Sequence, residues 1–149
     1  MSEELVLPLP KAKVSQISLE FAVESTEEPS QKIKPFLRWA GGKTRLLGAI
    51  LPFVPSKIID YHEPFLGSGA MFFAVRSRAR QCFVSDLNTE LVNLWQVLRK
   101  EPRAFYERIQ PFLQRQGEDM YYEVRAESPE HYLDRAARFF YLNPVMSQR

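Results

Sequence analysis

Residues 57–69 read Lys57-Ile58-Ile59-Asp60-Tyr61-His62-Glu63-Pro64-Phe65-Leu66-Gly67-Ser68-Gly69. The first six form a short, β-branched, apolar run, which is the pattern of a buried parallel strand. Glycines that directly follow a strand permit positive φ and let a ligand come close to the backbone. Residues 70–78 then follow a helical pattern. The segment therefore predicts a strand, a glycine-rich loop and a helix.

A second strand and a second helix follow in the next thirty residues. Residues 81–85 are an apolar, strand-like run, and residues 90–100 carry apolar side chains at helical spacing, namely Leu91, Leu94, Trp95 and Leu98. Strand, helix, strand and helix in this order indicate a βαβ unit with a right-handed crossover. The sequence thus predicts an α/β fold with at least two parallel strands.

The last third of the chain has a helical pattern. A first helix, bent or ended near Pro111, would have one apolar face formed by Phe105, Ile109, Phe112 and Leu113. Ser128 is a suitable N-cap for a further helix, with Pro129 at its first position. That helix would carry a stripe that we assign to core packing, formed by Leu133, Ala136, Ala137, Phe140 and Tyr141.

Length and composition suit one globular domain. The chain has 149 residues, of which 45% are hydrophobic and 13% aromatic. It contains neither the roughly 18 consecutive apolar residues of a membrane helix nor a basic stretch followed by an apolar core, so we expect no membrane span and no signal peptide. The single cysteine, Cys82, lies in an apolar run and is expected to be a buried thiol, which fits a cytoplasmic protein.

Charge divides the chain into two regions. Residues 1–31 hold six acidic and two basic residues, whereas the remainder holds eighteen basic and twelve acidic residues. Because Pro8, Pro10 and Pro29 interrupt the first region, we expect an acidic flexible leader over 1–31 that contains at most a short strand within 14–23. A basic domain after this leader is compatible with nucleic acid, although an ordinary solvated surface explains the charge equally well.

Two acids flank the glycine-rich loop at positions suited to a ligand. Glu63 precedes the loop and could pair with a cationic group such as an amino group. Asp86 ends the second predicted strand, where a carboxylate would accept hydrogen bonds from ribose hydroxyls, or would instead cap the next helix. The loop differs from the dinucleotide pattern G-x-G-x-x-G because Phe72 stands at the third glycine position, which favours a ligand without a pyrophosphate.

The segment Trp39-Ala40-Gly41-Gly42-Lys43-Thr44 has two possible interpretations. Its ending resembles a phosphate-binding P-loop, but Leu37 stands where that motif requires its first glycine, and no apolar strand directly precedes it. We therefore disfavour the P-loop. The flat ring of Trp39 and the cation of Lys43 could instead border a purine or a carboxylate.

Three segments resemble the Dam-type DNA adenine-N6 methyltransferases, also called the D12 or alpha class: residues 36–43, residues 63–69 and Ser85-Asp86-Leu87-Asn88, in this order. The resemblance runs from about residue 34 to residue 143. It implies a Rossmann-like methyltransferase domain with S-adenosylmethionine as cofactor. Carried over to this chain, the cofactor-binding residues of the family would be Trp39, Lys43, Glu63, Pro64, Phe65, Gly67, Gly69 and Asp86.

The chain departs from the family pattern at its end, which reads Asn143-Pro144-Val145-Met146-Ser147-Gln148-Arg149. The family's Asp/Asn-Pro-Pro-Tyr/Phe motif, which accepts the amino hydrogens of a flipped adenine and stacks on its ring, has no match here. We therefore expect the N-terminal part of such a domain, truncated before that motif and without catalytic residues. Residues 32–100 would bind the cofactor, and residues 101–149 would form the helical start of the target-recognition region.

The resemblance implies methyl transfer from S-adenosylmethionine to adenine N6 in duplex DNA, as in restriction-modification systems, with weak DNA binding by this chain. The alternative is a non-catalytic remnant or binding module that at most binds the cofactor. Two parallel strands leave apolar faces uncovered, so we also expect a need for a partner or a missing C-terminal half. His62 and His131 are isolated, and no metal site is expected.

Overall fold

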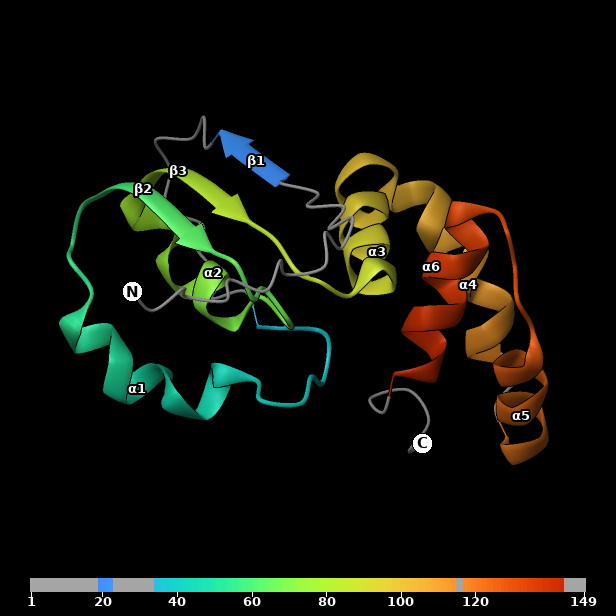
Figure 1. Cartoon of the computed structure of the whole chain (residues 1–149). Helices are drawn as coiled ribbons and strands as arrows, with labels where there is room; N and C mark the ends of the chain where they lie inside the picture. Colours follow the sequence, from blue (N-terminus) through green and yellow to red (C-terminus); the bar gives the residue numbers. More distant parts are fainter. Residues whose placement is uncertain (1–18, 23–33, 115–116, 144–149) are drawn as a thin grey trace, which may run out of the picture.

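The computed structural model describes residues 19–22, 34–114 and 117–143 (Figure 1). Three strands form one sheet in the order β1-β3-β2, with β1 at Leu19–Ala22, β2 at Ile58–Glu63 and β3 at Ala79–Val84. Strands β2 and β3 are parallel, with Tyr61 opposite Cys82, and β1 runs antiparallel to β3. Both predicted parallel strands are confirmed to within two residues at each end.

Strand β1 lies inside the region that the sequence assigns to a flexible leader. It occupies four residues of the range in which a short strand was expected. The other residues of that leader, 1–18 and 23–31, fall outside the described part of the chain. The third strand of the sheet is therefore supplied by the acidic N-terminal region.

Helix α2, at Ala70–Val75, connects the two parallel strands together with a 3₁₀ turn at Arg76–Arg78. The helix buries Ala70, Met71, Phe72 and Val75. The expected helix over 70–78 is thus confirmed for its first six residues, and its last turn tightens before β3 begins. Because β2 and β3 are parallel, this β2–α2–β3 unit places their carboxyl ends at the same edge of the sheet.

Helix α3, at Thr89–Lys100, follows β3 and is confirmed within one residue. It is capped by Asn88, whose Oδ1 accepts a hydrogen bond from the backbone N–H of Leu91 at 3.0 Å. Its apolar stripe is buried, with Leu94 fully inaccessible and Trp95 7% exposed. The stripe joins the main hydrophobic core.

Three further helices pack with α3 at the end of the molecule away from the sheet (Figure 1). They are α4 at Pro102–Gln114, α5 at Glu118–Ala126 and α6 at Tyr132–Leu142. Helix α4 continues for three residues beyond Pro111. The stripe predicted for α6 is confirmed in that Ala136, Ala137 and Tyr141 are buried.

The predicted start of α6 is wrong. Its N-cap is His131, so Ser128 and Pro129 do not open the helix. Helix α5, which the sequence analysis did not distinguish, ends at Ala126, and residues 127–130 are an extended connection. Ser128 precedes a proline, which disfavours the helical region for that residue and suits this connection.

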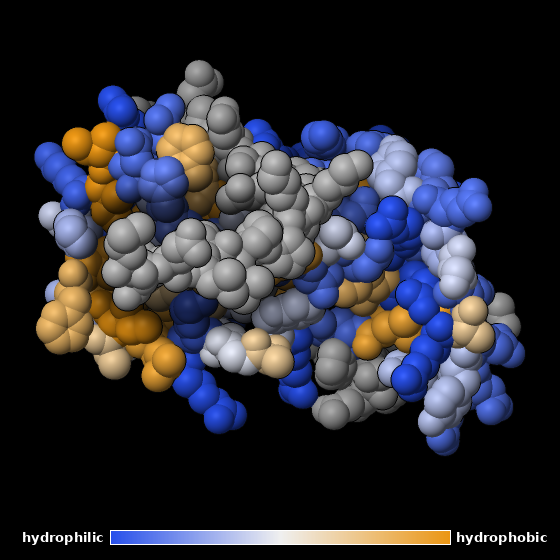
Figure 2. All heavy atoms as spheres, in the orientation of Figure 1, coloured by the Kyte–Doolittle hydropathy of each residue, from blue (hydrophilic) through white to orange (hydrophobic). Residues whose placement is uncertain are grey.

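The segment between the first motif and β2 forms three short turns, η1 at Lys43–Leu46, α1 at Leu47–Ile50 and η2 at Leu51–Phe53. None of them buries a residue. On the face drawn in Figure 2, apolar atoms gather near α1, and the exposed large hydrophobic residues of this neighbourhood include Leu46, Phe53 and Ile59. Leu46 and Phe53 belong to the turns and Ile59 to β2, so exposed apolar side chains of the described residues lie beside the sheet as well as on it.

Candidate functional site

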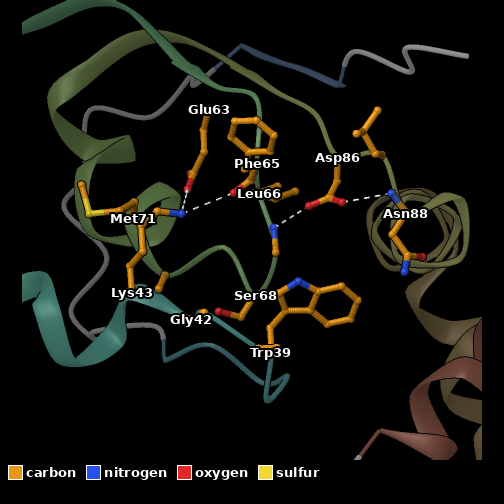
Figure 3. Close-up of a pocket in the computed structure, with 15 residues that line it drawn as sticks. Trp39, Gly42, Lys43, Glu63, Phe65, Leu66, Ser68, Met71, Asp86 and Asn88 are labelled. Atoms are coloured by element: carbon orange, nitrogen blue, oxygen red, sulfur yellow. Dashed lines mark hydrogen bonds and ion pairs between the residues drawn. The ribbon is translucent and has the colours of Figure 1, made fainter. Parts of the chain in front are cut away.

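A pocket of about 380 Å³ opens where the carboxyl ends of β2 and β3 meet the segment 39–43 (Figure 3). This volume lies in the usual range for a small-molecule site. The carboxyl edge of parallel strands is also where α/β sheets place their ligands. The pocket is lined by Trp39, Ala40, Gly41, Gly42, Lys43, Glu63, Phe65, Leu66, Gly67, Ser68, Ala70, Met71, Asp86, Leu87 and Asn88.

Backbone hydrogen bonds extend the β2–β3 pairing into the pocket wall. Ser85 N–H donates to the carbonyl of Glu63 at 2.9 Å, and Leu66 N–H donates to the carbonyl of Ser85 at 2.9 Å. The glycine-rich loop is therefore fastened to the end of β3. This attachment places Glu63 and Asp86, which are far apart in sequence, on the same pocket.

The carboxylate of Asp86 organises the loop from within. Its Oδ2 accepts a hydrogen bond from Gly67 N–H at 2.9 Å, and its Oδ1 accepts one from Asn88 N–H at 3.0 Å. The cap of α3 is Asn88, so Asp86 does not act as the helix cap. Each carboxylate oxygen has a second lone pair, so Asp86 can still accept hydrogen bonds from a ligand.

Two glycines of the loop have no room for a side chain. Gly67 has φ of +52°, and a Cβ atom built on it would lie 2.8 Å from Trp39 Cδ1. Gly69 has φ of +71°, and its Cβ atom would lie 3.0 Å from the ring of Trp95. The indole N–H of Trp95 also donates to the carbonyl of Gly67 at 3.2 Å. Both conformations are ones that glycine adopts without strain.

Glu63 is a buried residue, 6% exposed, whose carboxylate lies at the carboxyl end of β2. Its Oε2 accepts a hydrogen bond from the Tyr61 hydroxyl at 2.8 Å, and Lys43 Nζ lies 3.8 Å from its Oε1 (Figure 3). Burial raises the pKa of Glu63, while the Tyr61 hydrogen bond and the Lys43 charge oppose that rise. Burial likewise raises the pKa of Tyr61, and the neighbouring Glu63 carboxylate adds to the effect. The Lys43 charge and the Tyr61 hydrogen bond therefore favour the ionised form of Glu63, against the effect of burial on its pKa.

Lys43 also donates a longer hydrogen bond, 3.5 Å, to the carbonyl of Phe65. Its ammonium group thus contacts two oxygen acceptors, the carboxylate at the end of β2 and a carbonyl of the loop. Residues 34–42 form neither helix nor strand, so the segment lacks the strand that precedes a P-loop. Both observations disfavour the phosphate-binding interpretation.

Six of the eight residues selected from the sequence line this pocket: Trp39, Lys43, Glu63, Phe65, Gly67 and Asp86. Pro64 is not among the lining residues, and its carbonyl accepts a hydrogen bond from the Ser85 hydroxyl at 3.5 Å. Gly69 does not line the pocket either, and it is the N-cap of α2 in a left-handed conformation. Most of the additional lining residues lie within the three motifs, Leu87 among them, whereas Ala70 and Met71 follow the loop on α2.

Neither histidine joins a metal-binding group. His62 stacks on Phe83 with ring centroids 4.7 Å apart, and His131 Nδ1 lies 3.9 Å from Asp134. Across the described ranges, no three His, Cys, Asp or Glu residues are grouped so that they could hold a metal ion. In the same ranges, no helix has the length and apolar character needed to cross a bilayer.

Comparison with known proteins gives consistent similarities. A sequence model of the D12 class N6 adenine-specific DNA methyltransferases matches residues 39–148. The chain is 37% identical over 113 residues to the type II methyltransferase M.CviBI of Paramecium bursaria Chlorella virus NC1A, covering 74% of this chain and 42% of that protein. It is 34% identical over 122 residues to the DNA adenine methylase of Haemophilus influenzae, covering 78% of this chain and 42% of that protein. The chain thus spans about two fifths of the length of these curated relatives.

Proposed function

The chain belongs to the D12 class of N6 adenine-specific DNA methyltransferases, a class that depends on S-adenosylmethionine, and we propose that its pocket binds this cofactor for methyl transfer to adenine N6 in duplex DNA. The observation that carries the proposal is the pairing of two carboxylates, Glu63 and Asp86, across one glycine-rich loop. S-adenosylmethionine presents an amino group and a ribose diol, which are the two partners that such carboxylates suit.

The chemistry of the lining residues fits this cofactor. Glu63 is buried on the pocket wall beside Lys43, and its carboxylate could also accept hydrogen bonds from the amino group of the cofactor. Asp86 already holds the loop through Gly67 and retains acceptor capacity for ribose hydroxyls. Trp39 and Lys43 border the pocket where a purine face or a carboxylate could lie.

When bound, S-adenosylmethionine supplies an electrophilic methyl group on a sulfonium ion. The contribution of this part of the protein is then binding and orientation. The carboxylates of Glu63 and Asp86 make the pocket favourable for a cationic ligand, and the glycine backbone permits close approach. A ligand held by both acids is fixed at two points, and its reactive group therefore has a defined position.

The division of the chain is part of the same proposal. We assign residues 32–100 to a Rossmann-like cofactor-binding region and residues 101–149 to the helical start of the target-recognition region. The parallel pair β2 and β3 joined through α2 supports the first assignment. A cytoplasmic location is proposed with it, because DNA and the methyl donor are available there. The similarities do not favour the alternative of a non-catalytic binding module.

Photolabelling tests the cofactor assignment. Ultraviolet irradiation of the full chain with tritiated S-adenosylmethionine should attach label to peptides that contain residues 39–43 or 63–71. Excess S-adenosylhomocysteine should suppress the labelling, and excess ATP should not. Label confined to the helical residues after 101, or labelling suppressed equally by ATP, would contradict the proposal.

A further inference from the structure

We propose that Asn143, directly after α6, is a positioning residue for the pocket, because its side-chain amide holds the backbone of Arg38 and thereby places Trp39 as one pocket wall. The identity of the ligand in this inference rests on the proposed function. The placement of the wall rests on the geometry alone.

The contact between Asn143 and Arg38 is reciprocal. Arg38 N–H donates to Asn143 Oδ1 at 3.2 Å, and Asn143 Nδ2 donates to the carbonyl of Arg38 at 3.0 Å. One side-chain amide thus pairs with both polar groups of one backbone residue, as a neighbouring strand would. Asn143 is 7% exposed and both hydrogen bonds are partly buried, so removing the amide would leave the N–H and carbonyl of Arg38 without these partners.

Aromatic contacts join the same two segments. The rings of Trp39 and Phe139 have centroids 6.0 Å apart, and those of Phe36 and Phe140 are 6.2 Å apart. Segment 36–39 is therefore attached to α6 and its C-cap at three successive points, of which the Asn143 amide is the directional one. Aromatic pairs tolerate sliding more readily than a two-bond amide clamp does.

Segment 34–42 takes its position from contacts with other elements, among them buried Leu37, the Phe36 ring on Trp95 at 5.2 Å and the Asn143 amide. It forms neither helix nor strand, so it has no continuous backbone ladder of its own. Its internal contact, Gly42 N–H to the carbonyl of Trp39 at 2.9 Å, closes a turn but does not fix where the turn lies. The position of Trp39 therefore follows from what its neighbours in the sequence are bonded to, and Arg38 is bonded to Asn143.

The fit of Trp39 against the loop leaves little tolerance. The indole ring fills the space that a side chain at Gly67 would need, and Gly67 is held in turn by the Asp86 carboxylate. A small movement of the Arg38 backbone would therefore open or close the pocket on its Trp39 side. Because linkage is reciprocal, a ligand that requires Trp39 in place also favours this position of α6.

Fluorine NMR with binding measurements on the full chain tests the inference. The chain contains two tryptophans, so labelling with 6-fluorotryptophan yields two resonances, which Trp39→Phe assigns. Asn143→Ala removes both hydrogen bonds, whereas Asn143→Asp retains the acceptor for Arg38 N–H. The matched control is Asn93→Ala, which removes another amide-to-backbone bond to α6, the 2.8 Å contact with the Tyr132 carbonyl, at the end far from Asn143.

In Asn143→Ala we expect the Trp39 resonance to shift more than that of Trp95, whose ring Phe36 contacts, with S-adenosylmethionine affinity about tenfold weaker. Asn93→Ala should change neither. An unmoved Trp39 resonance with affinity equal to that of the control would overturn the inference. So would collapse of both resonances in both Asn143 variants, since Asn143 would then support the whole fold. A selective Trp39 shift in a protein that binds no S-adenosylmethionine would uphold the positioning role and refute the proposed ligand.

Discussion

The carboxylate of Asp86 and the backbone N–H of Gly67 are joined by a 2.9 Å hydrogen bond that spans nineteen residues of sequence. This bond connects the end of β3 to the loop that follows β2. It means that Asp86 both shapes the glycine-rich loop and borders the pocket. Substitution of Asp86 is therefore expected to affect the site in two ways, through lost ligand contacts and through a loosened loop.

Replacing Asp86 with alanine should weaken S-adenosylmethionine binding by roughly 2–4 kcal/mol, the scale of a charged hydrogen-bonding partner removed from a partly buried site. Equilibrium dialysis with labelled cofactor measures the change. Asp60→Ala is the control, because that carboxylate on β2 forms a long, exposed ion pair with Arg80 at 3.9 Å and does not line the pocket. Equal affinities for the two variants would remove Asp86 from the site.

Replacing Gly67 with alanine should destabilise the loop and displace Trp39. A left-handed backbone costs a non-glycine residue about 1–2 kcal/mol, and the new Cβ atom would also meet Trp39 at 2.8 Å. Gly48→Ala is the matched control, since a Cβ there meets nothing within 4 Å and alanine suits helix α1 better than glycine. Urea denaturation compares the two. A Gly67→Ala protein as stable as the control would show that the loop differs from this description.

The raised pKa of Glu63 makes stability depend on pH in a defined direction. Above pH 4.5, the ordinary value, the folded state holds the Glu63 proton more tightly than the unfolded chain. The free energy of unfolding should therefore fall as pH rises from there through the raised pKa, relative to the variant Glu63→Gln. Denaturation at a series of pH values checks this slope.

Glu107→Gln is the control for that series, because Glu107 is an exposed residue of α4 paired with Arg103 at 3.2 Å. It should leave the wild-type slope unchanged. Binding should show the opposite trend, since a cationic amino group favours ionised Glu63, and affinity should rise over the same pH range. A Glu63→Gln protein with the wild-type pH profile would rule out this role.

DNA binding by this chain should be weak, non-specific and dependent on salt. Arg76, Arg78 and Arg80 form a basic group, but Arg78 donates to the Val54 carbonyl at 3.3 Å and Arg76 lies over Phe73. Arg80, with a side chain 72% exposed, is the best placed to meet a phosphate. The logarithm of the DNA affinity falls linearly with the logarithm of the salt concentration. Arg80→Ala should make that slope shallower by about 0.9, the value for one phosphate contact.

Fluorescence anisotropy on two unrelated duplexes measures that dependence, with Arg103→Ala on α4 as an exposed basic control. The control should retain the wild-type slope. If both variants reduced the salt slope by the same amount, no particular arginine would be responsible for contacting the DNA backbone. Strong preference for one duplex would contradict the expected non-specific mode.

The central elements of the fold followed from local patterns in the sequence. β2, β3 and α3 were predictable because β-branched runs and helical spacing identify them without knowledge of their neighbours. The start of α6 was not, because Ser128-Pro129 also suits an extended connection, and the choice depended on where α5 ends. β1 was only a weak expectation, since a four-residue edge strand is defined by its pairing with β3.

The pocket was predictable to the extent that its residues lie in motifs. Glu63 and Asp86 were selected from their positions after two strands, and the structure brings both to one cavity. Pro64 was selected in the same way but does not line the pocket, because motif membership does not specify which residues of a loop face a cavity. The contact of Asn143 with Arg38 joins residues 105 positions apart and left no local signal.

Isothermal titration of the purified, folded chain with S-adenosylmethionine and, separately, with ATP is the most direct test of the proposed cofactor site. We predict saturable binding of S-adenosylmethionine and none of ATP, because two carboxylates and a glycine loop without a P-loop suit a cationic nucleoside and repel a triphosphate. Saturable binding of ATP, or no binding of S-adenosylmethionine by a chain shown to be folded, would contradict the account.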